Sequence, residues 1–227
     1  MKPPICLFLL YCLGISAFGQ SRDSVRVLII YGSEPAQGYS TEYKWFGGRP
    51  GGHVVLQTGK DRVLSFAPTV YHPWCHIFPS RKPADFRSSF TTKSVSAFWQ
   101  TFNYTHSPNY CVDSLRQLVV SIPITPTQRK RLDSLSRAYL SHPPYDYAVV
   151  GMRCASATYE ILAQIGAFQH PYKQNIWWHV LFPRDLRYEL LKEAHNNTNP
   201  AAKTWRIYQT TGCITRNWDY DRSAKNF

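Results

Sequence analysis

The chain has 227 residues, of which 44% are hydrophobic, and its formal net charge at pH 7 is +12. This is the length of one domain with a substantial buried core, and the lack of repeats and low-complexity blocks argues against a solenoid or a disordered chain. The Lys and Arg residues are scattered along the sequence rather than gathered in a stripe. The charge therefore favours attraction to anionic polymers and surfaces over nucleic-acid binding.

The N-terminal segment has the features of a cleavable signal peptide. Lys2 supplies a positive charge, Ile5–Ile15 is an apolar stretch, and small residues precede a cleavage site after residue 19. The apolar stretch is shorter than the roughly 20 residues that a transmembrane helix needs. We therefore expect residues 1–19 to be removed. Residues 20–227 are expected to form a single periplasmic or secreted domain without a transmembrane segment.

Apolar and β-branched runs predict a first strand and then a hairpin. Val25–Tyr31 is the first run, and residues 32–50, which are rich in Gly, Ser and Pro, follow as a long loop. His53–Thr58 and Arg62–Pro68 then flank a Gly-containing turn, a pattern typical of a β-hairpin. Because side chains alternate along a strand, every second residue from His53 onward is expected on one face.

The middle of the chain gives weaker signals. Residues 69–93 are expected to be irregular, and Val95–Phe102 is ambiguous between helix and strand. Leu115–Ile124 has the apolar, β-branched composition of a further strand.

Local capping rules place two helices after this strand. Thr125 is a good N-cap and Pro126 suits the first helical position, so a helix is predicted to begin there and to end near Ser141. A second helix is predicted over Cys154–Ile165, with Gly166 as the residue that follows its C-cap.

A third helix over Phe182–Ala194 and a last strand over Trp205–Ile214 complete the predicted order. One strand, a hairpin and another strand are thus followed by three helices and a final strand. This order predicts an α+β fold in which an antiparallel sheet packs against helices on one side.

Cys154 is the strongest candidate for chemistry. In the first turn of a helix, unpaired backbone N–H groups and the helix dipole stabilise a thiolate and can hold an oxyanion. Arg153 adds positive charge beside it and is a candidate substrate contact. The alternative interpretation is an inert, buried thiol of the kind that is common in protein cores.

His53 is the candidate base for this thiol. It follows Gly51 and Gly52, which let the backbone approach a ligand closely, so Gly52 is a candidate substrate contact. A histidine at the end of a strand, facing a cysteine at a helix N-terminus, is the arrangement that a Cys–His pair requires. The alternative is a half-exposed histidine that makes an ordinary hydrogen bond.

Two segments of the chain resemble a known family. GGHVVLQTG with RVLSF after it, and YDYAVVGMRCASATYEILAQIG about a hundred residues later, are similar to the permuted NlpC-like branch of the papain-fold cysteine hydrolases. That branch includes peptidoglycan endopeptidases and amidases, and lipid acyltransferases of the lecithin–retinol type. The chain also resembles exported Bacteroidetes proteins. The resemblance spans His53–Gly166 and implies a papain-like fold with circularly permuted order.

The resemblance implies a role for each matched position. Cys154 matches the nucleophile and His53 matches the base. The family carries a third polar residue about a dozen positions after the histidine, which here is Ser65, a weaker orienter of an imidazole than His, Asn, Gln or Asp. A tyrosine shortly before the cysteine often lines such sites, and Tyr145 or Tyr147 can fill that place. Aromatic packing is an equally good interpretation of both tyrosines.

The remaining cysteines and histidines give weaker signals. His72, Cys75 and His76 fit no closed zinc pattern, so no metal site is expected, and no cofactor is expected either. Export permits disulfides, and Cys75 can instead pair with Cys111, which would leave Cys213 single.

The sequence thus predicts an exported thiol hydrolase, an amidase or endopeptidase, that cleaves cell-envelope peptides through an acyl-enzyme. Peptidoglycan or another anionic envelope polymer is the expected partner. Two alternatives stay open. One is acyl transfer or ester hydrolysis on lipids by the same residues, and the other is a non-catalytic envelope binding protein, which the weak residue Ser65 favours.

Overall fold

The structure is a computed structural model that describes residues 23–33, 53–69, 76–98, 115–167, 180, 182–195 and 201–211. The predicted signal peptide and most of the expected loop 32–50 lie outside these residues. Among the described helices, none has the length and apolar character needed to cross a membrane.

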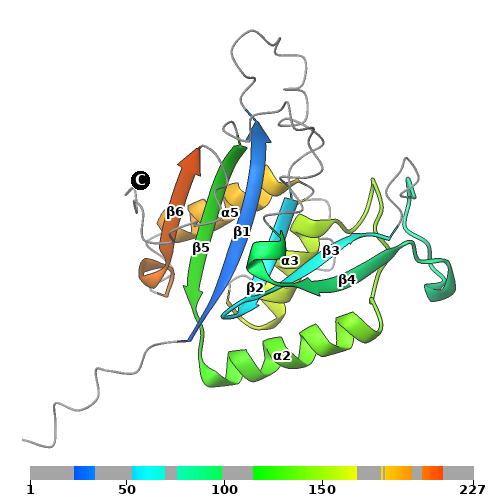
Figure 1. The fold of residues 1–227 in the computed structure, drawn as a ribbon, viewed down its shortest axis with the longest axis horizontal. Helices are drawn as coiled ribbons and strands as arrows, with labels where there is room; N and C mark the ends of the chain where they lie inside the picture. Colours follow the sequence, from blue (N-terminus) through cyan, green and yellow to red (C-terminus); the bar gives the residue numbers. More distant parts are fainter. Residues whose placement is uncertain are drawn as a thin grey trace, which may run out of the picture.

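One antiparallel sheet of six strands is the centre of the fold, with the strand order β4-β3-β2-β1-β5-β6 (Figure 1). Its strands are β1 (Ser24–Ser33), β2 (His53–Gly59), β3 (Arg62–Pro68), β4 (Ser88–Lys93), β5 (Leu115–Pro123) and β6 (Arg206–Thr211). The combination of helices with an antiparallel sheet confirms the predicted α+β class. The predicted hairpin is β2–β3, with Val55 opposite Ser65.

Strand β4 corrects the expectation that residues 69–93 are irregular. Its six residues pair with β3, and Phe90 lies opposite Phe66, with the two rings stacked at a centroid distance of 4.6 Å. In β4 only Ser88 and Phe90 are buried, and its last three residues are exposed. An edge strand with one large apolar side chain lacks the hydrophobic alternation that predicts strands from sequence.

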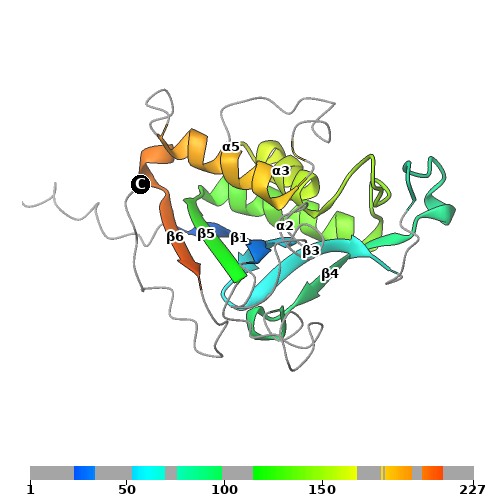
Figure 2. The ribbon, with the colours of Figure 1, turned by 90° about the horizontal axis from the view of Figure 1, so that it is seen from above.

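Three helices cover one face of the sheet (Figure 2). They are α2 (Pro126–Ser141), α3 (Cys154–Gln164) and α5 (Pro183–His195). Helix α2 begins at the predicted N-cap, where Thr125 and Gln128 form a reciprocal capping box. Helix α3 ends at the predicted glycine, since Gly166 has a φ of +74° and Ala167 N–H donates to the Leu162 carbonyl.

Apolar side chains are buried on both faces of the sheet. On the helix face, Val54 and Leu56 of β2 pack with the buried sides of the three helices. On the opposite face, Val55 of β2 packs with Phe98, which belongs to a short helical segment at 95–98. The alternation along β2 therefore assigns His53 and Val55 to the Phe98 face and Val54 to the helix face.

Candidate functional site

Helix α3 is the most deeply buried helix that the structure describes, and it begins with Cys154. Eight of its eleven residues are buried, and Cys154 itself is 3% exposed. The thiol is free and lies against β2, where the backbone N–H of Val54 hydrogen-bonds to it. The Ala155 N–H and the Tyr147 hydroxyl also donate to the sulfur. The start of α3 thus points its thiol at the residue that directly follows His53.

Burial decides the protonation state of this thiol. Loss of solvent raises the pKa of Cys154 above its ordinary value of 9.0. The hydrogen bonds from Val54, Ala155 and Tyr147 and the charge of Arg153 act in the other direction but are outweighed. The thiol is therefore neutral at pH 7. This differs from the expectation that the helix N-terminus yields a thiolate, because the sequence does not show how deeply the helix is buried.

His53 opens β2 and bonds to the predicted third residue. Its Nε2 lies 2.9 Å from Oγ of Ser65, which is 7% exposed in β3. The imidazole also approaches the Phe98 ring, at a centroid distance of 6.1 Å. Burial, and secondarily the charge of Lys93, lowers the pKa of His53 to about 4. The imidazole is therefore neutral at pH 7, the state in which it can accept a proton.

The two candidate catalytic groups both lie next to the first two residues of β2, but on different faces of the sheet. Cys154 lies beside Val54 on the helix face, whereas His53 bonds to Ser65 on the Phe98 face. His53 is the first residue of β2, so a direct contact between its imidazole and the thiol would have to pass around this end of the strand. A Cys–His pair here depends on that end of β2.

The two candidate tyrosines have different surroundings. The Tyr147 hydroxyl donates to the Cys154 sulfur, as a residue that lines the site would. Tyr145 instead packs edge-on against Phe66 at 5.2 Å, and its hydroxyl donates to Glu160 Oε2 at 2.5 Å. Tyr145 therefore joins a buried aromatic and polar cluster between the helices and the sheet.

Arg153 makes contacts that organise the start of α3. Its guanidinium donates to the carbonyls of Ala148 and Val149, with a distance of 3.3 Å from Nε to the Ala148 oxygen, and it stacks on the Phe182 ring at 4.9 Å. Its backbone N–H donates to Oγ of Ser156 at 2.8 Å. These contacts fix the turn that precedes Cys154. The other candidate substrate contact, Gly52, lies outside the described residues.

The sequence analysis singled out none of the buried carboxylates, two of which hold side chains near the candidate site. Glu160, 4% exposed, accepts from Tyr139 and Gln164 as well as from Tyr145. The helical period gave a signal here, since position 160 lies three residues after the apolar Ala157 and next to Ile161 in the predicted helix 154–165. The second carboxylate, Asp146, lies in a loop, where no periodicity marks a buried position.

Asp146 anchors the loop that precedes β4. It has no exposed surface, and it accepts from His76 Nδ1, from the Ser80 N–H at 3.1 Å and from the Arg87 N–H at 2.9 Å. Burial alone raises the pKa of Asp146, but these hydrogen bonds together hold it below its ordinary value of 3.8. The carboxylate is therefore ionised and ties residues 76–88 to the segment before α3.

A metal centre finds no support in the described part of the chain. No group of three or more His, Cys, Asp or Glu side chains there is arranged to hold a metal ion. His76, one of the three weak metal candidates, bonds to Asp146. The other two, His72 and Cys75, and the cysteines 111 and 213 lie outside the described residues.

Comparison with known proteins adds no assignment. No protein family, no curated protein and no solved structure matched the chain. A functional proposal for this chain therefore rests on its side chains and on the resemblance in the sequence.

Proposed function

We propose that the protein is an exported thiol hydrolase in which Cys154 is the nucleophile, His53 the base and Ser65 the orienter of the imidazole. One observation carries the proposal. The thiol at the start of α3 lies against the amide of the residue that follows His53, while His53 Nε2 bonds to Ser65 at 2.9 Å. These are the three positions that the resemblance to the permuted NlpC-like hydrolases assigns.

The proposed reaction is amide hydrolysis through an acyl-enzyme. Nε2 of His53 is engaged with Ser65, so we assign the proton transfer to Nδ1. The Cys154 S–H proton passes to Nδ1 as the sulfur attacks the carbonyl carbon, and the proton then passes to the leaving nitrogen as the C–N bond breaks. Water next cleaves the thioester with the same base. The Cys154 N–H and the Tyr147 hydroxyl are the proposed donors to the oxyanion.

The resting state in this proposal is a neutral pair. A thiol with a pKa above 9.0 and an imidazole with a pKa of about 4 leave both groups uncharged across the pH range between these values. The base thus removes the proton only as the substrate is attacked. We expect kcat/KM to rise with pH through the pKa of His53, near 4, and then to stay level up to the alkaline titration of the thiol.

The proposed substrate class is a cell-envelope peptide. The predicted signal peptide supports a location in the periplasm or outside the cell, and the net charge of +12 favours peptidoglycan or another anionic envelope polymer as the partner. Ester hydrolysis on lipids uses the same three residues with an alcohol as the leaving group in place of an amine. Acyl transfer differs further, because an acceptor other than water takes the acyl group from Cys154.

Alkylation of Cys154 tests the proposed pair. The protein is treated with iodoacetamide between pH 6 and pH 10, and adducts are mapped by mass spectrometry. We expect labelling of Cys154 to increase above pH 9, and His53→Ala to change its rate at least several-fold. His142→Ala, which removes an exposed histidine after α2, is the matched control and is expected to label like the wild type.

Product analysis then tests the reaction itself. Release of peptide fragments from purified peptidoglycan that is abolished in Cys154→Ser and retained in His142→Ala supports the proposed hydrolase. If the protein hydrolyses phospholipids in vesicles but releases nothing from peptidoglycan, its substrate is a lipid and not a peptide. Inactivity on both substrates, with a thiol that reacts only after unfolding in urea, contradicts the proposal.

The depth of Cys154 favours a second candidate function. A thiol that is 3% exposed, with a raised pKa, has the properties of an inert core residue. A non-catalytic protein that binds envelope polymers is consistent with this burial. In that case Cys154→Ala leaves binding to peptidoglycan, measured by co-sedimentation, unchanged.

A further inference from the structure

An exposed apolar surface lies on the loop before β4 and on the turn that precedes α3. Ile77 is 65% exposed, Phe78 is 69% exposed, and the neighbouring Val149 is 41% exposed. We refer to these three residues as the apolar tip. Figures 1 and 2 both show the segment that carries Ile77 and Phe78 at one end of the molecule, beyond the ends of β3 and β4. Large apolar side chains gathered on a projecting loop are typical of an interaction surface.

The apolar tip is held in place by hydrogen bonds. Val149 N–H donates to the His76 carbonyl at 2.9 Å, and Val150 N–H donates to the Ile77 carbonyl at 2.8 Å. The buried carboxylate of Asp146 secures the base of the same loop through His76. After Phe78, the Ser80 N–H donates to the same carboxylate at 3.1 Å. Because the backbone is held on both sides of Phe78, the fold of the loop sets the exposure of these side chains.

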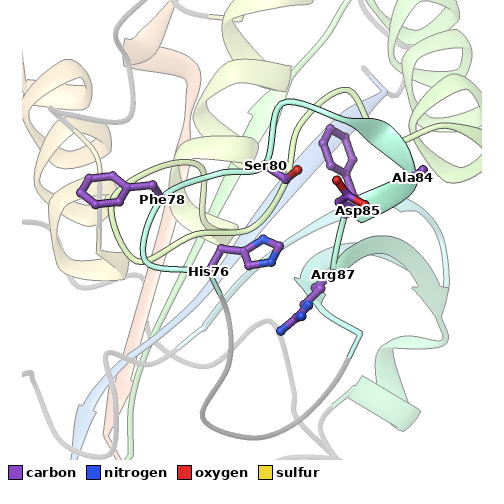
Figure 3. A pocket seen from close by; sticks show the side chains of 7 residues that line it. His76, Phe78, Ser80, Ala84, Asp85 and Arg87 are labelled. Atoms are coloured by element: carbon purple, nitrogen blue, oxygen red, sulfur yellow. The ribbon is translucent and has the colours of Figure 1, made fainter.

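Positive charge lies on the same loop as the apolar tip. Arg81, Lys82 and Arg87 follow within ten residues of Phe78 and are all exposed, against one exposed acid, Asp85. Figure 3 shows the Phe78 ring directed away from Arg87 and Asp85. Those two residues line an open hollow of about 520 Å³ together with His76, Phe78 and Ser80. One loop thus carries exposed apolar groups at residues 77 and 78 and exposed cations at residues 81, 82 and 87.

We infer that the apolar tip docks on an anionic lipid surface, with Ile77 and Phe78 entering the boundary between headgroups and acyl chains. Lys and Arg beside exposed aromatic and aliphatic side chains form the pattern that binds such interfaces, because the cations attract the headgroups while the apolar groups leave water. A second copy of this chain is a poorer occupant, since it carries the same net charge of +12. This inference is independent of the chemistry proposed for Cys154.

Vesicle co-sedimentation tests the docking. The purified protein is mixed with vesicles of equal parts phosphatidylglycerol and phosphatidylcholine, and with vesicles of phosphatidylcholine alone. We expect binding to the anionic vesicles, and Ile77→Ser/Phe78→Ser to weaken it about tenfold or more, as the loss of two large apolar groups predicts. Leu140→Ser/Tyr188→Ser is the matched control, because it removes two exposed apolar side chains from α2 and α5. It is expected to bind like the wild type.

A second pair of variants tests the charges. Arg81→Gln/Lys82→Gln is expected to weaken binding about tenfold, whereas Lys130→Gln/Arg131→Gln, which removes two exposed cations from α2, has a much smaller effect. Thermal unfolding of every variant checks that it is folded.

Several outcomes overturn the docking inference. Equal weakening by both charge pairs shows adsorption by net charge, without a role for the loop. Undiminished binding of Ile77→Ser/Phe78→Ser excludes insertion of the apolar tip. Self-association of the wild type in light scattering, lost in that variant, assigns the surface to a second copy instead. Cys154→Ala is expected to bind vesicles normally, so failure of the proposed hydrolase leaves this result unaffected.

Discussion

At the scale of single residues, burial controls the chemistry that Cys154 and His53 can perform. Burial raises the pKa of the thiol and lowers the pKa of the imidazole, so each group is held in its neutral form. The helix N-terminus and Arg153 favour a thiolate but are outweighed at Cys154. A neutral thiol is less prone to oxidation than a thiolate, which would suit the exported location proposed for this chain.

The lowered pKa of His53 predicts a pH dependence of folding stability. Between its ordinary value of 6.5 and about 4, the unfolded chain binds a proton that the folded chain lacks, so stability falls as the pH falls through this window. Because His53 as a residue keeps some exposed surface, solvent screens part of the effect, and we expect a loss of about 2 kcal/mol from this group. Urea unfolding of His53→Gln at pH 7 and pH 4 is expected to show a correspondingly smaller decrease than the wild type.

The control for this prediction is the exposed His142. His142→Gln keeps the buried imidazole and is expected to lose stability with falling pH as the wild type does. An identical pH dependence in His53→Gln and the wild type contradicts the lowered pKa.

At the scale of elements, sequence patterns located the strands and helices with strong local signals. The hairpin β2–β3, the capping box of α2 and the glycine after α3 each depend on residues close together in the chain. Strand β4 was missed because its position depends on pairing with β3, and Phe90 alone marks it as a strand. The same limit applies to Asp146, whose hydrogen-bond partners His76, Ser80 and Arg87 are distant in sequence.

For the candidate site residues, the sequence named positions but not the states of their side chains. Ser65 was named by the resemblance alone, and in the structure the pairing of Val55 with Ser65 brings that side chain to 2.9 Å from His53 Nε2. The protonation state of Cys154 depends on how helix, sheet and solvent are arranged around it in three dimensions. Local sequence does not encode this arrangement.

The glycine that ends α3 gives a prediction at the same scale. Gly166 has a φ of +74°, a conformation that an L-residue adopts at a cost, and the nearest atom to an added Cβ is 3.8 Å away. Gly166→Ala is therefore expected to lower the free energy of unfolding by about 1–2 kcal/mol through backbone strain alone. Gly59→Ala is the control, because a Cβ there also meets its nearest atom at 3.8 Å but the φ is not positive. The free energies of unfolding of both variants are measured in urea. If Gly166→Ala is as stable as Gly59→Ala, the backbone strain inferred at Gly166 is wrong.

At the scale of the whole molecule, one arginine joins three parts of the fold. Arg129 of α2 donates to both carboxylate oxygens of Asp23, at 2.5 and 2.8 Å, and to the carbonyl of Ser24 at the start of β1. It also donates to the carbonyl of Thr58 in β2. The hydrogen bonds from Arg129 lower the pKa of Asp23 below its ordinary value of 3.8. These bonds attach helix α2 to the start of β1 and to the end of the adjacent strand β2.

Removal of this arginine is expected to loosen the whole domain. Arg129→Gln leaves the carbonyls of Ser24 and Thr58 without a charged donor, and we expect the free energy of unfolding to fall by about 1–2 kcal/mol. Thermal unfolding measures the change. Arg131→Gln, on the exposed side of the same helix, is expected to unfold at the wild-type temperature. A wild-type melting temperature for Arg129→Gln excludes the role given to Arg129.

The turn between Asp146 and Val150 has a mechanical consequence. On one side its amides hold the backbone of His76 and Ile77, and on the other its carbonyls hold the guanidinium of Arg153, one residue before Cys154. A displacement of Ile77 must either break these bonds or move the turn with it. A force that moves the projecting loop is therefore transmitted to the first turn of α3 through only a few bonded residues.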